Sequence, residues 1–486
     1  MQFNSWQFAI FLPIVFFIYY ALNHKYRWML LLGASYFFYM YWDPKLVVLI
    51  ATTTLVSYAC AIKMDEADSD KSKKGWMLVG VLTGLVILFF FKYFNFFSRT
   101  VTSVLRMMEI PARDYVLDLM LPVGISFYTF QTLSYVFEVY RGNMKAERHL
   151  GLYALYVSFF PQLVDGPIER PGNMLPQYKE ETKFSYDEVT YGLKLMAWGF
   201  FKKMVIASSL AVYVDMVFDA PQEYEGLALI IASVFFTIQI YCDFSGYSDI
   251  AVGTARLFGK NIMQNFKAPY FAKSIKEFWG RWHISLSTWF RDYVYIPLGG
   301  NRVSSVKHKW NLMITFLTSG LWHGANWTFV VWGGLHGMLQ VIEGLWREKY
   351  PRDKDKTDKW YVTAGRILVT FSLVSFAWIF FRANNFADAW YVITHLFDKI
   401  GYPMIYLLQG FRSIGLTKVK LAGVVMPVLL LILYDYYDQK SSVIDKISSL
   451  AAWKRWLIYV AFVSGIIIFV AASYGNVSQE FIYSQF

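Results

Sequence analysis

Runs of about twenty apolar residues recur along the chain and constrain its fold more than any other feature. A helix of about 20 apolar residues has the length needed to cross the hydrocarbon core of a bilayer. Read in windows, the sequence predicts roughly ten to twelve transmembrane helices, and therefore an all-α polytopic membrane protein. The clearest apolar runs are residues 10–21, 28–41, 77–91, 231–241, 369–381 and 458–472.

Composition agrees with this class. The chain is 56% hydrophobic and 17% charged, whereas soluble domains carry about 25% charged residues. The first apolar run has neither the basic start nor the small-residue cleavage site of a signal peptide, so we expect it to be retained. The net charge of +11 is scattered over short loops, which favours a membrane surface over nucleic acid as its partner. Cys60 and Cys242 lie in apolar surroundings and predict no structural disulfide.

Basic loops orient a membrane chain, because loops rich in Lys and Arg stay in the cytoplasm. This rule predicts an extracytoplasmic N-terminus and an extracytoplasmic C-terminal tail. The loops predicted to be cytoplasmic are 23–27, 63–75, 141–149, 347–360 and 440–455. We expect one membrane domain over 1–486, comprising N-terminal helices (1–142), a core that carries the motifs (150–346), C-terminal helices (361–475) and a tail (476–486).

The stretch SGLWHGANWTFVVWGGLHG (319–337) places His323 in an apolar segment. Both flanks are basic, including a loop at 306–310, so both ends are predicted to be cytoplasmic. Residues 311–322 would form a helix of only about 18 Å, against about 30 Å of hydrocarbon. A hairpin that turns near 323–326 inside the membrane satisfies both facts. Irregular backbone at that depth must be buried or line a wet cavity. His323 is therefore predicted to face an internal chamber; the alternative is a core histidine bonded to a carbonyl.

Residues 276–302 mix Trp with Arg and are too polar to span a membrane. We expect an amphipathic helix at the cytoplasmic leaflet, with His283 on it as either an interfacial or a functional side chain. Its polar face would carry Glu277, Arg281, Ser285, Thr288 and Asp292. A different segment, 159–177, is rich in Pro and Gly and cannot form one straight helix.

The chemistry that the sequence suggests depends on histidine. Metal-binding, nucleotide-binding and serine-hydrolase motifs are absent from the sequence, so no metal or nucleotide-redox cofactor is implied. A neutral histidine in a closed pocket suits removal of a proton from a hydroxyl, and His323 is the candidate, while His336 and His395 are expected to be structural. Four cations could bind phosphates at the cytoplasmic mouth or contact lipid headgroups: Lys273, Lys276, Arg281 and Arg291.

Two motifs give a family resemblance. WHISLSTWFRDYVYIPLGGNR (282–302), followed by TSGLWHGANWTFVVWGGLHG (318–337), resembles the signature of the membrane-bound O-acyltransferase family. This resemblance implies a ring of helices around a central tunnel open to both faces. An acyl donor, usually acyl-CoA, would enter from the cytoplasm and the acceptor hydroxyl from the other side. Other stretches resemble the bacterial alginate O-acetyltransferase branch: 35–49, 121–142, 159–171, 192–207 and 239–253.

The resemblance also implies roles for individual residues. His323 matches the catalytic histidine of the family, and His283 matches a second motif position that would orient the donor or polarise its thioester carbonyl. Tyr483, in the tail FIYSQF, resembles a tyrosine that carries an acyl group in a related D-alanine transfer system. The alternative for Tyr483 is an aromatic anchor at the membrane interface. The candidate donor-binding residues are Lys276, Arg281, Trp282, Arg291 and Asn326.

The function implied is a multi-pass O-acetyltransferase of a bacterial plasma membrane. It would take acetyl from cytosolic acetyl-CoA, without a bound cofactor, for an extracytoplasmic polysaccharide such as alginate or peptidoglycan. A separate SGNH-type acetyltransferase outside the membrane is the expected partner. One alternative is transfer of D-alanine or a long acyl chain to a lipid, protein or teichoic acid. Another is a transporter or flippase whose path is marked by buried acids: Asp165, Glu169, Asp243 and Asp249.

Overall fold

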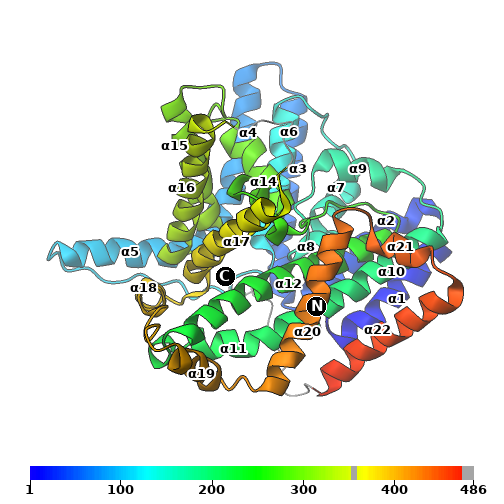
Figure 1. Cartoon of the computed structure of the whole chain (residues 1–486). Helices are drawn as coiled ribbons and strands as arrows, with labels where there is room; N and C mark the ends of the chain where they lie inside the picture. Colours follow the sequence, from blue (N-terminus) through cyan, green and yellow to red (C-terminus); the bar gives the residue numbers. More distant parts are fainter. Residues whose placement is uncertain (352–357, 473–486) are drawn as a thin grey trace. The chain divides into compact units, whose positions relative to one another are not determined.

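Helices supply the regular structure of residues 1–351 and 358–472, which the computed structural model describes and in which no strand occurs (Figure 1). Within this part of the chain, 7 helical stretches are long and apolar enough to cross a membrane. They are Pro44–Asp65, Asp70–Met107, Tyr186–Phe218, Leu227–Leu257, Trp360–Arg382, Lys418–Asp438 and Ala452–Ala471. Helix α1 is apolar too but shorter, with 16 residues. The protein is thus an all-α, multi-pass integral membrane protein.

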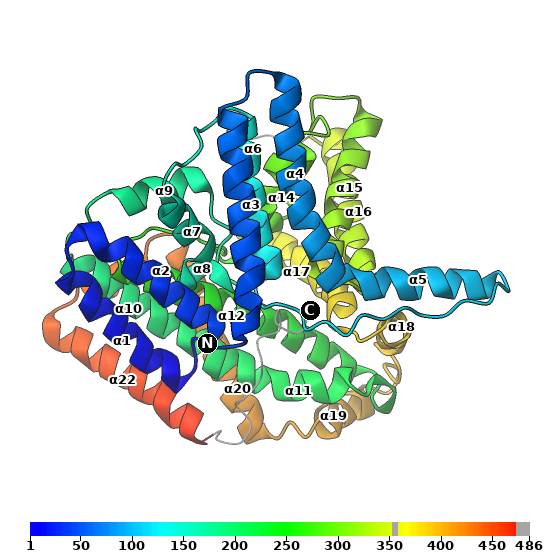
Figure 2. The same cartoon turned by 180° about the vertical axis from the view of Figure 1, so that it is seen from behind.

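The helices form two compact units. The first comprises Met1–Met196 and Ile250–Met263. In it, α3, α4 and α6 lie side by side (Figures 1 and 2). Close approach of α4 to α6 depends on Gly80, because a Cβ there would lie 3.2 Å from Val136 of α6. Its helices are α1 (Trp6–Ala21), α2 (His24–Met40), α3 (Val47–Asp65), α4 (Asp70–Leu88), α5 (Phe94–Met107), α6 (Ile125–Tyr140), α7 (Leu150–Ser158), α8 (Phe160–Leu163) and α9 (Pro171–Lys179).

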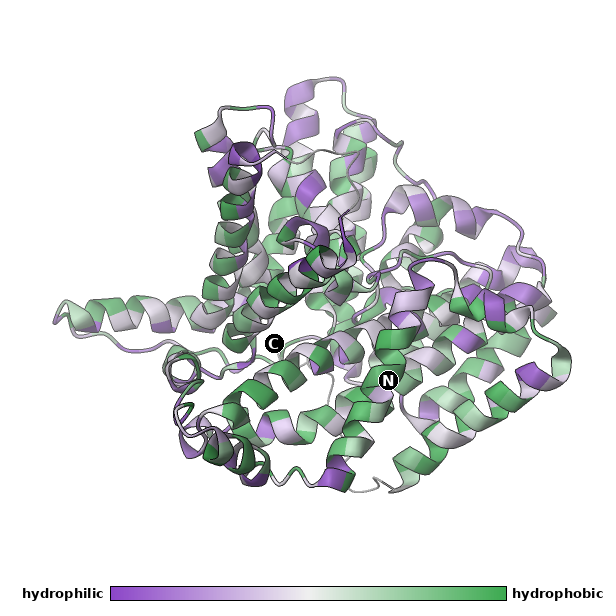
Figure 3. Ribbon diagram, in the orientation of Figure 1, coloured by the Kyte–Doolittle hydropathy of each residue, from purple (hydrophilic) through white to green (hydrophobic). Residues whose placement is uncertain are grey.

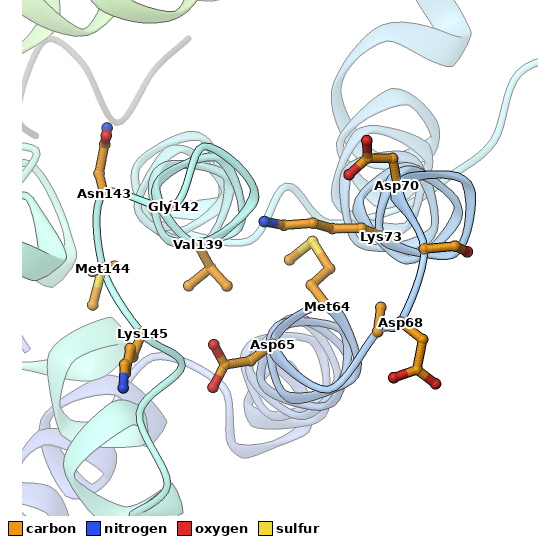
Figure 4. A pocket seen from close by; sticks show the side chains of 12 residues that line it. Met64, Asp65, Asp68, Asp70, Lys73, Val139, Gly142, Asn143, Met144 and Lys145 are labelled. Atoms are coloured by element: carbon orange, nitrogen blue, oxygen red, sulfur yellow. The ribbon is translucent and has the colours of Figure 1, made fainter.

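Two loops predicted to share the cytoplasmic side lie at the same end of this unit. The loop after α3 and the loop after α6 line one pocket of about 520 Å³ (Figure 4). Arg148, from the second loop, pairs with Asp65 at 3.0 Å and with Glu66 at 2.7 Å. The prediction for 159–177 is also confirmed, since this segment divides into α8 and α9 with a turn between them.

The second unit comprises Ala197–Asp249 and Gln264–Phe486. Its core is rich in tryptophan, while the exposed residues of α20 and α22 are largely apolar (Figure 3), as expected of surfaces that face lipid. Helices α10 (Tyr186–Phe200) and α12 (Leu227–Leu257) contribute residues to both units. The other helices are α11 (Ser208–Phe218), α13 (Ile275–Trp279), α14 (Ile284–Phe290), α15 (Ser305–His323), α16 (Trp327–Lys349), α17 (Trp360–Arg382), α18 (Phe386–His395), α19 (Pro403–Ser413), α20 (Lys418–Asp438), α21 (Val443–Ser448) and α22 (Ala452–Ala472).

The shape of the predicted hairpin is confirmed: α15 and α16 pack along one another, joined by a turn after His323 (Figure 1). The depth of that turn in the membrane stays a prediction. The prediction of a loop at 306–310 was wrong, because the Ser304 hydroxyl caps α15 and the helix already begins at Ser305. Glycines let the two backbones touch. A Cβ on Gly333 would lie 2.3 Å from the carbonyl oxygen of Phe316, and one on Gly320 would lie 2.3 Å from that of Phe329.

Gly333→Ala is therefore expected to destabilise the protein by about 1–3 kcal/mol, because the new methyl group forces the hairpin apart. Gly344→Ala is the matched control on the same helix, since no atom would lie within 4 Å of its Cβ. Thermal unfolding in detergent checks both variants. Equal unfolding temperatures for the two variants would contradict this account of the hairpin.

Candidate active site

A break in the chain positions His283. Helix α13 ends at Trp279, and α14 begins only at Ile284. Between them, His283 adopts a left-handed backbone conformation, with φ 42° and ψ 54°. Asn265 holds the start of α14: its carbonyl oxygen accepts a hydrogen bond from the Ile284 N–H at 2.9 Å, and its side-chain oxygen accepts one from the Ser285 hydroxyl at 2.6 Å. The turn thereby places the imidazole of His283 fully inside the protein.

This break corrects the expectation of one amphipathic helix at the leaflet surface. The predicted polar face assumed an unbroken helical period, and the left-handed residue at 283 changes that phase. Ser285 on the predicted polar face is fully buried, as is the adjoining Trp282. Arg281 and Glu277 remain neighbours, but they pair with each other at 2.7 Å. The middle of the segment, around Trp282 and Ser285, is thus part of the core.

His323 is the last residue of α15, at the turn of the hairpin. Its side chain is buried, with 3% of its surface exposed. The ring nitrogen Nδ1 lies 2.7 Å from the carbonyl oxygen of Ser319, one turn earlier on the helix. A carbonyl oxygen can only accept a hydrogen bond, so Nδ1 donates and carries the hydrogen, and Nε2 of the neutral ring carries the lone pair. This is the tautomer that a general base requires.

The two histidines share one aromatic cluster. Their ring centroids are 6.5 Å apart. Trp332 of α16 packs against His323 at 4.8 Å, and Phe381 of α17 does so at 5.6 Å. Burial, and then the nearby His323, lower the pKa of His283 well below its usual range, so this ring is neutral near pH 7. Two buried, neutral imidazoles can accept and donate protons without an ionic partner.

The sequence around this cluster has known relatives. The sequence model of the membrane-bound O-acyltransferase family matches residues 149–383, which include both histidines and the hairpin. A probable alginate O-acetylase from Pseudomonas aeruginosa is 37% identical over 436 residues, covering 88% of this chain and 81% of the relative. The chain belongs to the membrane-bound O-acyltransferase family.

Two further relatives show the breadth of this O-acyltransferase family around the chain. A peptidoglycan O-acetyltransferase from Helicobacter pylori is 34% identical, covering 82% of this chain and 80% of the relative. A teichoic acid D-alanyltransferase from Bacillus subtilis is 29% identical, covering 54% of this chain and 69% of the relative. The resemblance found in the two motifs is thus confirmed, and the chain is an acyltransferase by family.

The structure brings some of the predicted donor-binding residues of this acyltransferase to the histidines and leaves others apart. Trp282 joins the aromatic cluster, with its ring 5.0 Å from that of Trp378. Asn326 caps α16 by accepting a hydrogen bond from the Thr328 N–H at 3.1 Å. Arg281 also contacts Gln439, at 2.7 Å. Outside the cluster, Arg291 is half exposed and pairs with the adjoining Asp292, and Lys276 is exposed on α13. Tyr483 lies outside the described residues.

Sequence reasoning missed a pair of buried lysines in the acyltransferase. They lie in a π-helical segment, Phe201–Ala207, that continues α10. Lys202 pairs with Asp249 at 2.7 Å, and Lys203 pairs with Asp243 at its carboxylate oxygen Oδ1. The signal was present, because the sequence GFFKKMVIA places two cations in an apolar run. Asp243 and Asp249 thus have cationic partners, as buried charges require.

Glu169, another acid considered as part of a transport path, also has partners. Its side chain accepts hydrogen bonds from the Met263 N–H and from Asn173, the latter at 2.9 Å. Burial raises the pKa of Glu169 above its usual range. These partners account for its burial without a transported ion, which weakens the transporter alternative.

Proposed function

We propose that the protein takes an acetyl group from cytosolic acetyl-CoA and passes it across the membrane for O-acetylation of an extracytoplasmic polysaccharide. The observation that carries this proposal is the buried pair of His323 and His283 at the hairpin turn. Relatives named for alginate and peptidoglycan O-acetylation, each aligned over most of this chain, support acetyl as the group and polysaccharide as the destination. The plasma membrane of a bacterium is the proposed location.

His323 acts as the base in this proposal. Nε2 takes the proton of the acceptor hydroxyl while the hydroxyl oxygen bonds to the carbonyl carbon of acetyl-CoA. The carbon–sulfur bond then breaks, and CoA leaves as a thiolate that takes the proton back from His323. His283 orients the donor or donates a hydrogen bond to the thioester carbonyl as negative charge develops there. Arg281, Arg291, Lys276, Trp282 and Asn326 are the proposed contacts for the remainder of the donor.

Tyr483 is the proposed first acceptor, and a separate SGNH-type transferase outside the membrane is the proposed recipient. The phenol of a tyrosine is mostly protonated at neutral pH, with a pKa of about 10, so it needs a base such as His323 to react. The carrier role would let a membrane enzyme hand acetyl to a partner without binding the polysaccharide itself.

The test is consumption of acetyl-CoA by the purified protein in detergent, with release of free CoA as the readout. Palmitoyl-CoA in parallel distinguishes acetyl from long-chain transfer, and a D-alanyl donor tests the function in the name of the Bacillus subtilis relative. We expect acetyl-CoA alone to be consumed. Failure to consume any thioester, even with an extracytoplasmic transferase added, would overturn the proposal and favour transport.

A labelled acetyl group should remain on the wild-type protein and be absent from Tyr483→Phe, because the phenyl ring has no hydroxyl to acetylate. Mass spectrometry of the C-terminal peptide checks this expectation. Tyr474→Phe, which removes the other tyrosine after α22, is the control and should retain the label. Label that persists in Tyr483→Phe would leave Tyr483 as an interfacial anchor.

A further inference from the structure

A third histidine in the same unit, His336, has a fixed hydrogen-bonding role. It lies on α16 and is fully buried. The indole N–H of Trp279 lies 3.3 Å from its Nδ1. An indole nitrogen only donates, so Nδ1 of His336 accepts this bond and the hydrogen of the neutral ring sits on Nε2. His336 therefore presents a donor, Nε2–H, whereas Nε2 of His323 carries a lone pair.

This donor has no acceptor among the described residues. The same is true of the indole N–H groups of Trp332 and Trp378, whose rings stack on each other at 5.4 Å. Trp332 also packs against His336, with ring centroids 5.0 Å apart. A buried donor without an acceptor costs about 1–3 kcal/mol, and three such donors adjoin one another here. These three N–H groups are thus suited to bind a molecule that supplies acceptor oxygens.

The position of His336 along the hairpin indicates which molecule binds these donors. Its ring stacks near Phe316 of α15, with centroids 6.4 Å apart. Phe316 comes seven residues before His323, which corresponds to about 10 Å along a helix. That displacement is toward the open end of the hairpin, where Lys307, Lys309 and Arg347 predict the cytoplasmic side. A donor that enters from the cytoplasm passes this level before its thioester reaches His323.

We propose that Nε2–H of His336 donates a hydrogen bond to an amide carbonyl oxygen in the pantetheine arm of the CoA donor. The inference rests on the proposed function, because it assumes a CoA thioester. Pantetheine is a thin chain whose secondary amides stand between the thioester and the nucleotide. The ring of Phe278 stacks on His336 and that of Trp332 packs against it in a T-shaped contact. These aromatic surfaces suit such a chain, while the unpartnered N–H donors suit its carbonyls. His336 thus binds the donor and takes no part in proton transfer.

The test compares His336→Phe, which keeps an aromatic ring without the donor, with His336→Gln, whose side-chain N–H replaces Nε2–H. We expect His336→Phe to raise the KM for acetyl-CoA about tenfold, the effect of about 1.4 kcal/mol, with kcat changed less than twofold. His336→Gln should retain a KM close to that of the wild type. A structural role alone would lower the stability of both variants and leave their KM values equal.

A second measurement isolates the arm from the thioester. S-ethylpantetheine, an unreactive thioether that keeps both amides, should raise the unfolding temperature of the wild type and of His336→Gln, and fail to do so in His336→Phe. Equal binding to all three proteins would overturn the inference and leave water as the acceptor. Because this readout needs no turnover, wild-type protein that binds the thioether but consumes no acetyl-CoA would refute the proposed function instead. Trp279→Phe removes the N–H donor that fixes the tautomer of His336. The rise in unfolding temperature that S-ethylpantetheine produces in this variant should therefore lie between those of His336→Phe and His336→Gln.

Discussion

Replacing His323 with alanine should lower acetyl-CoA turnover by a factor of about 10² to 10⁴, the contribution of a well-placed general base. The reason lies in the ring's surroundings. Nδ1 is bonded to the carbonyl of Ser319, which fixes the tautomer and directs the lone pair of Nε2 away from the helix backbone. His336 has the opposite tautomer, because its Nδ1 accepts a hydrogen bond from Trp279.

His395→Ala is the control for this variant. His395 lies on α18, its Nδ1 is 2.9 Å from the carbonyl of Tyr391, and its side chain is 37% exposed. His395→Ala therefore removes an imidazole with the same kind of backbone contact, but from a position outside the aromatic cluster. Turnover close to that of the wild type is expected for this variant. Full turnover by a folded His323→Ala protein would remove His323 from the mechanism.

The second large effect concerns stability. Lys203→Met is expected to lower the free energy of unfolding by about 3–5 kcal/mol, because it removes the ammonium group that pairs with Asp243 in a buried site. Both side chains of this pair are less than a tenth exposed. Lys203→Arg keeps the charge and should recover much of the loss. Equilibrium unfolding in mixed detergent micelles measures the difference.

Arg148→Met provides the comparison with an exposed ion pair. Arg148 also contacts two carboxylates, but its side chain is 55% exposed. Ion pairs in water contribute about 0–1 kcal/mol, so this variant should be nearly as stable as the wild type. If the two methionine variants unfold alike, the buried pair is not a major source of stability.

The membrane class and the hairpin could be predicted from sequence because each leaves a local signal. The two histidines of the candidate site were identified from the resemblance of their motifs to a family. Apolar length identifies a helix that can span a bilayer, and basic residues on both flanks of 319–337 indicate a hairpin. The short length assumed for residues 311–322 was wrong, because they are part of the 19-residue helix α15. The break before α14 left no such signal, because helical periodicity assumes an unbroken helix. The partners of Lys202 and Lys203 are Asp249 and Asp243, which lie at least forty residues further along the chain on α12, so only tertiary packing reveals them. The donor role of His336 likewise depends on Trp279, which is distant in sequence.

The backbone at His283 has a consequence for how this protein can change. A residue with a side chain costs roughly 1–2 kcal/mol in the left-handed conformation, a cost that glycine avoids. The φ of 42° at this position therefore sets stability against chemistry: the amino acid that best fits the turn is one that has no imidazole. Glycine at 283 would relieve this backbone strain, but it would also leave a cavity where the buried imidazole packs and would supply no ring nitrogen for the chemistry. Thermostable variants of this enzyme should accordingly be screened for turnover before this turn is altered.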